Sequence, residues 1–85
     1  MDVPDLSAVR ERFPALARTA PDGRPFAFLD APGGTQVPEA VIEAIAAYLR
    51  TSNANLHGAF ETSRETDQVV EEARRAGADL LGADL

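Results

Sequence analysis

A single candidate β-strand, with no second strand to pair with it, most constrains what this chain can fold into. Residues 26–30 read Phe-Ala-Phe-Leu-Asp, an apolar and aromatic run that is typical of a short strand. A lone strand leaves both of its edges unpaired, so it does not make a stable sheet. The sequence therefore predicts an α/β fragment over residues 1–85 that is mostly helical and is an incomplete part of a larger domain.

A short helix is expected near the N-terminus. The carboxylate of Asp5 can accept backbone N–H groups, which makes Asp5 the expected N-cap. The helix should end near Arg12, because the residue before Pro14 is disfavoured in the helical conformation. A second short helical turn is predicted over residues 15–18.

Two longer helices are expected over residues 38–52 and 63–81. Thr62 and Glu65 have the T-x-x-E spacing of a capping box, and Gly82 is the expected left-handed residue after the last turn. Each helix has an apolar stripe and a polar remainder. The stripe of the first helix consists of Val41, Ile45, Tyr48 and Leu49, with Ile42 beside it. The stripe of the second consists of Val69, Val70, Ala73, Gly77, Leu80 and Leu81.

Charge and composition narrow the classes of function. The formal net charge is −6, and all eight basic residues are Arg. This balance argues against nucleic acid and anionic membranes as partners. No run is long and apolar enough to span a bilayer, and the absence of Cys fits a cytoplasmic protein. One His without Cys gives no spacing for a metal site.

Two loops contain candidate binding residues. Gly33, Gly34 and Thr35 lie between the candidate strand and a helix, where backbone N–H groups can bind a carboxylate or phosphate. A tight turn is the simpler interpretation, since neither dinucleotide-binding nor Walker spacing is present.

The second loop, residues 53–60, joins the two longer helices and contains Asn55, Gly58 and His57, which is the single histidine. A histidine can serve as acid, base or aromatic stacking partner. No carboxylate is evident beside His57 in the sequence, so a structural role is the simpler interpretation for this residue as well.

The order of these segments resembles the N-terminus of the class V aminotransferase family, which has the pyridoxal-phosphate fold type I. The similarity is carried by the runs Leu-Asp-Ala-Pro-Gly-Gly-Thr-Gln-Val-Pro at 29–38 and Ser-Asn-Ala-Asn-Leu-His-Gly-Ala-Phe at 52–60. Both runs look most like the cysteine desulfurase-like subgroup. Cysteine desulfurases have an Arg directly after the His, whereas this chain has Gly58 there.

The resemblance implies a role for both loops at the substrate cleft of a larger, dimeric enzyme that acts on an amino acid. The implied substrate-binding residues are Gly33, Gly34, Thr35, Asn55, His57 and Gly58. The family's Schiff-base Lys, its Asp for the pyridine nitrogen and its phosphate-binding cup are expected outside this chain, which has no Lys. The implied partner is the remainder of the enzyme or a homodimer partner, and pyridoxal phosphate is the implied cofactor of the whole protein.

A different class of function remains open on the residues alone. The two apolar stripes are also typical of a small, non-enzymatic helical module that docks on another protein. In that case the polar loops would only cap the helices.

Overall fold

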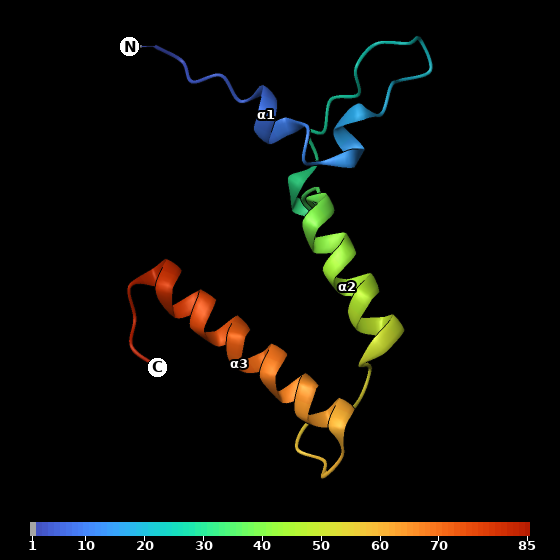
Figure 1. Ribbon diagram of the computed structural model, residues 1–85. Helices are drawn as coiled ribbons and strands as arrows, with labels where there is room; N and C mark the ends of the chain where they lie inside the picture. The colour runs from blue at the N-terminus through green and yellow to red at the C-terminus, as the bar shows by residue number, and fades with distance from the viewer. Residues whose placement is uncertain (1) are drawn as a thin grey trace. The chain divides into compact units, whose positions relative to one another are not determined.

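The computed structural model describes residues 2–85 (Figure 1). Its helices are α1 (Ser7–Arg10), the 3₁₀-helices η1 (Pro14–Ala17) and η2 (Ala31–Gly33), α2 (Glu39–Thr51) and α3 (Glu61–Leu81). The chain divides within α2 into two compact units, one up to Ile45 and one from Ala46 to Leu85. The predicted mostly helical structure is confirmed, with the longer helices beginning and ending within two residues of the expected positions.

The first unit begins with α1, which is shorter than expected. The Asp5 carboxylate accepts the backbone N–H of Ser7 at 3.0 Å and its hydroxyl at 2.6 Å. The residue in the N-cap position is Leu6, so Asp5 satisfies the helix terminus from one position earlier. As expected, the helix does not pass Pro14, which begins η1.

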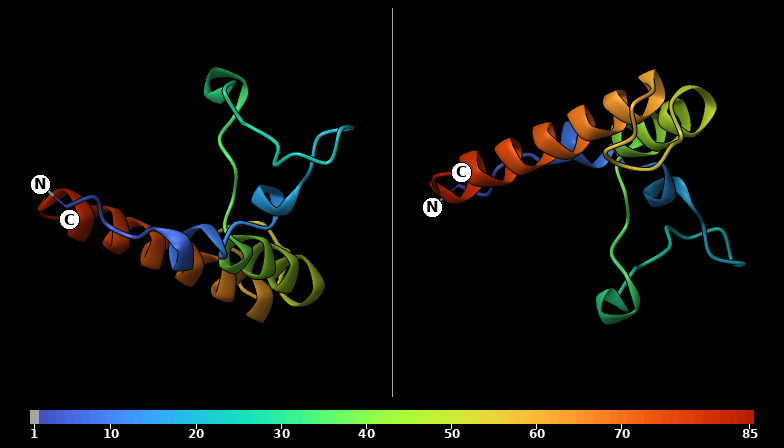
Figure 2. Two further views of the ribbon diagram at one scale, coloured as in Figure 1. Left: turned by 90° about the horizontal axis from the view of Figure 1, so that it is seen from above. Right: turned by 90° about the horizontal axis from the view of Figure 1, so that it is seen from below.

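The strand predicted over residues 26–30 does not form. Among the described residues, the only β pairing is one antiparallel bridge between Thr19 and Pro25, across the turn that contains Gly23. This segment runs as an open loop in Figure 2, and the side chain of Leu29 is 91% exposed. Residues 2–85 contain no neighbouring strand to accept its backbone hydrogen bonds, so its β propensity has no ladder to join.

The second unit consists of the C-terminal part of α2, the loop after it and α3. The end of α2 and the start of α3 lie side by side (Figures 1 and 2), joined by a hydrogen bond between Tyr48 and Thr66. No apolar side chain is buried among the described residues, and the buried residues are Ser63 and Thr66. The tightest packing in this unit is therefore polar, at the junction of the two helices and their loop.

The ends of α3 show one confirmed prediction and one correction. Gly82 has φ of 64°, and Ala83 N–H donates to the Ala78 carbonyl at 2.9 Å, as in a Schellman C-cap. The prediction of a capping box at Thr62 and Glu65 is wrong. The helix α3 begins at Glu61, and its N-cap residue is Phe60, whose side chain makes no capping hydrogen bond. Thr62 therefore lies inside the first turn.

Candidate functional site

The buried hydroxyl of Ser63 holds the backbone of the loop between α2 and α3 in place. Gly58 N–H donates to Ser63 Oγ at 2.7 Å, and the Ser63 hydroxyl donates to the carbonyl of Asn55. Ser63 is 0% exposed, so both bonds are shielded from water. One side chain on the first turn of α3 thus fixes the loop backbone on both sides of His57.

Gly58 lies too close to α3 to have a side chain. A Cβ at this position would be 2.9 Å from Ser63 Oγ and would also collide with the ring of Phe60. The hydrogen bond to Ser63 requires this close approach of the backbone.

The other end of the loop is anchored by Tyr48 of α2 and Thr66 of α3. Their hydroxyls are 3.0 Å apart, and the Tyr48 hydroxyl also contacts the N–H and carbonyl of Ala54 at 3.4 and 3.3 Å. The Thr66 hydroxyl lies 3.1 Å from the Ser52 carbonyl. A network shared by both helices therefore fixes where the loop begins, and its polar groups are satisfied.

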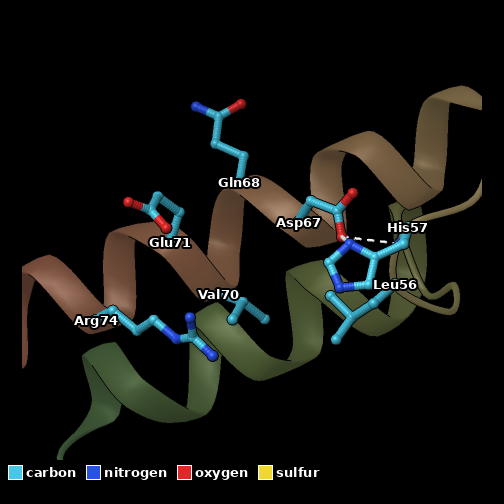
Figure 3. Close-up of a pocket in the computed structure, with 7 residues that line it drawn as sticks. All are labelled: Leu56, His57, Asp67, Gln68, Val70, Glu71 and Arg74. Atoms are coloured by element: carbon cyan, nitrogen blue, oxygen red, sulfur yellow. Dashed lines mark hydrogen bonds and ion pairs between the residues drawn. The ribbon is translucent and has the colours of Figure 1, made fainter. Parts of the chain in front are cut away.

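His57 lies at the centre of the loop and points outward. Its φ of 63° is in the left-handed region, which is uncommon for a residue with a side chain. Its backbone N–H donates to Oδ1 of Asp67 at 2.9 Å, and its ring nitrogen Nδ1 lies 3.3 Å from the same oxygen (Figure 3). The ring is 85% exposed, whereas Asp67 is 33% exposed. An anchored carboxylate thus holds an accessible imidazole.

An open pocket of about 440 Å³ adjoins His57 (Figure 3). It is lined on the loop side by Leu56 and His57, and along α3 by Asp67, Gln68, Val70, Glu71 and Arg74. The lining offers carboxylates, an amide, a guanidinium and an imidazole, together with two aliphatic side chains. This mixture suits a small polar molecule with groups of both charges more than an apolar ligand.

The glycine loop lies in the first unit. Gly33 ends η2, and Gly34 has φ of 133°, a conformation that favours glycine. The N–H groups of Gly33 and Gly34 donate to Asp30 and Ala31 carbonyls at 2.8 and 2.9 Å, so they are engaged in the turn. Thr35 and Gly34 line a small pocket of about 140 Å³. These contacts favour the turn interpretation for the backbone of this loop.

The structure brings Asn55, His57 and Gly58 together in one loop, with Gly33, Gly34 and Thr35 in the other unit. The sequence interpretation missed Ser63 and Asp67, and it was wrong that His57 lacks a carboxylate partner. A signal was present in the spacing, since Ser63, Thr66 and Asp67 lie at i, i+3 and i+4 on one face of α3.

No group of three or more His, Cys, Asp or Glu side chains that could hold a metal occurs within residues 2–85. Pyridoxal phosphate, which the resemblance implies, does not fit this chain alone, because no Lys is present to bind it. None of the described helices is long and apolar enough to cross a membrane.

Comparison with known proteins gives one family and a consistent set of relatives. The family described as aminotransferase class-V matches residues 27–85. A probable cysteine desulfurase of Vibrio cholerae is 38% identical over 80 residues, and one of Halobacterium salinarum is 37% identical over 81. A cysteine desulfurase of Cronobacter sakazakii is 37% identical over 81 residues.

The alignments cover nearly all of this chain but only a small share of each relative. They include 93% of this chain for the V. cholerae protein and 94% for the other two, but 20% of each relative. The chain thus spans about a fifth of the length of these three curated relatives.

Proposed function

The chain belongs to the class V aminotransferase family, and on this premise we propose that it forms the N-terminal portion of a pyridoxal-phosphate-dependent enzyme that acts on an amino acid. The observation that carries the proposal is the family match over residues 27–85, which includes both candidate loops. One relative is described as a cysteine desulfurase and two as probable cysteine desulfurases. Release of sulfur from cysteine is therefore the favoured reaction, with transamination as the other outcome.

In this proposal the loop with Asn55, His57 and Gly58 forms one wall of the substrate cleft. The exposed imidazole of His57 contacts the substrate, and the buried hydroxyl of Ser63 keeps the loop in place. Such pre-organisation lowers the entropy lost when a substrate is oriented. The turn at Gly34 and Thr35, in the first unit, is the other segment proposed to bind substrate.

The remaining structure of the enzyme covers the surfaces that this chain leaves open. The apolar side chains of α2 are exposed, including Ile45 at 56% and Leu49 at 59%. We expect these apolar side chains to pack on the remainder of the enzyme or on a homodimer partner. In this proposal the chain is not an independent helical module that docks on another protein. The Lys that binds the cofactor comes from outside these 85 residues, so the chain does not catalyse the reaction alone.

The test is an activity assay on the full-length protein that contains this chain. We expect alanine and protein-bound sulfane sulfur from cysteine, with sulfide released once an added thiol reductant supplies two electrons. We expect His57→Ala to lower kcat/KM by about tenfold or more through loss of substrate positioning. Glu43→Gln, an exposed change on α2, is the matched control and should leave kcat/KM unchanged. A protein that neither binds pyridoxal phosphate nor converts any amino acid would contradict the proposal.

A further inference from the structure

We propose that Asp67 is a positioning residue that holds the ring of His57 as the Nδ1–H tautomer and leaves Nε2 free to accept a hydrogen bond. The use of that acceptor rests on the proposed function, because a substrate must reach the loop. The tautomer itself is a property of this chain and can be measured without a reaction.

Two contacts to one oxygen atom carry the inference. Oδ1 of Asp67 accepts the His57 backbone N–H at 2.9 Å and lies 3.3 Å from His57 Nδ1. A carboxylate can only accept hydrogen bonds, so the ring nitrogen that faces it is the one that carries the proton. The opposite ring nitrogen points away from Asp67 in Figure 3.

The backbone contact explains why the ring stays beside the carboxylate. His57 has φ of 63°, and a residue with a side chain is disfavoured in this left-handed region. The charge-assisted bond from its N–H to Asp67, together with the Ser63 bonds to Asn55 and Gly58, stabilises this conformation. With the backbone fixed, rotation of the side chain is the main freedom left to the ring, and the Nδ1 contact restricts it.

The chemical consequence is a defined acceptor on an accessible ring. Nε2 of the Nδ1–H tautomer has a lone pair and no proton. With 85% of the side chain exposed beside the pocket, this atom can accept a hydrogen bond from the ammonium or thiol group of an amino acid. The opposite tautomer would present an N–H there and repel an ammonium group.

The test uses the full-length protein that contains this chain, because no apolar core is buried among residues 2–85 themselves. Nitrogen chemical shifts of ¹⁵N-histidine, assigned to His57 by the signals lost in His57→Gln and recorded at alkaline pH, distinguish protonated from bare ring nitrogens. We expect mainly Nδ1–H in the unmodified chain and mainly Nε2–H in Asp67→Ala. Alanine is the strongest helix former, so this substitution does not break α3.

Glu71→Gln is the matched control, because Glu71 lines the same pocket without contacting His57 through a hydrogen bond or ion pair. It should leave the tautomer unchanged. Three results would each overturn the inference: an Nε2–H ring in the unmodified chain, the same tautomer in Asp67→Ala as in the unmodified chain, or a random-coil chemical shift of the His57 amide. None of these chemical shifts depends on enzymatic turnover. If His57 is the Nδ1–H tautomer but the protein converts no amino acid, the proposed function is refuted and the inference about Asp67 stands.

Discussion

Close approach of the backbone at Gly58 makes this position sensitive to the smallest side chain. We expect Gly58→Ala to destabilise the loop by about 1–3 kcal/mol, as in other overpacked sites. The exposed ring of Phe60 can move aside, but Ser63 is buried and bonded on both sides. Native-state hydrogen exchange of the residue 58 amide measures the local free energy of opening.

Gly77→Ala is the control for this substitution. Gly77 lies within α3 with nothing within 4 Å of an added Cβ, so alanine should stabilise the helix by about 1 kcal/mol. Equal effects of the two substitutions on hydrogen exchange would contradict the account of Gly58.

The hydrogen bonds of the Asp5 carboxylate should make the stability of the start of α1 depend on pH. Hydrogen bonds from the Ser7 hydroxyl and backbone N–H lower the pKa of Asp5 below its ordinary value of 3.8. The contribution to stability is therefore present above 3.8 and is lost as the pH falls through the lowered pKa. An NMR titration of the Ser7 amide should follow this midpoint.

Ser7→Ala checks the cause of the shift. It removes the hydroxyl, which is the larger of the two effects, and should raise the Asp5 midpoint toward 3.8. A midpoint that does not move would show that the hydroxyl does not stabilise the carboxylate.

At the scale of elements, the two ends of α3 should respond differently to substitution. Gly82→Ala forces alanine into φ of 64° and should destabilise the C-terminus by about 1–2 kcal/mol. Thr62→Ala should change stability by less than about 0.5 kcal/mol, because Thr62 lies inside the first turn and its side chain does not cap it. Helix content by circular dichroism and exchange of the Ala83 amide measure both. A larger effect of Thr62→Ala would indicate that the Thr62 side chain does cap the helix.

At the scale of the whole molecule, absence of a buried apolar core among the described residues predicts a broad transition. We expect the isolated chain to lose helicity gradually on heating, because apolar burial is the main source of cooperative stability. In the full-length protein the same segment should unfold in a steep transition. A sharp, two-state transition of the 85-residue chain alone would contradict this prediction.

The missing lysine gives a second prediction at this scale. When the chain is mixed with pyridoxal phosphate and reduced with borohydride, peptide mapping should find the label on the N-terminal amine alone. No other primary amine exists in the sequence. Label at an internal position would contradict the prediction.

Local patterns predicted the helices well, because each depends on neighbours a few residues apart. The apolar spacing of α2 and the left-handed Gly82 were readable in this way. The strand over residues 26–30 was not, since a strand exists only through pairing with another segment. The spacing of Ser63, Thr66 and Asp67 indicates that they share one face of α3, but it does not say what that face contacts. The contact between His57 and Asp67 spans ten residues and a change of chain direction, so the spacing alone does not predict it.

The sequence by itself determined the helical segments, the absence of a cofactor lysine and the family to which the loops belong. Only the tertiary structure decided how the loop after α2 is held. Ser63, Thr66 and Asp67 face it because the start of α3 lies beside the end of α2. Their hydroxyl and carboxylate groups bind loop atoms that are distant in sequence. The physical reason is that hydrogen bonds of this kind depend on positions in space, which helical periodicity alone does not specify.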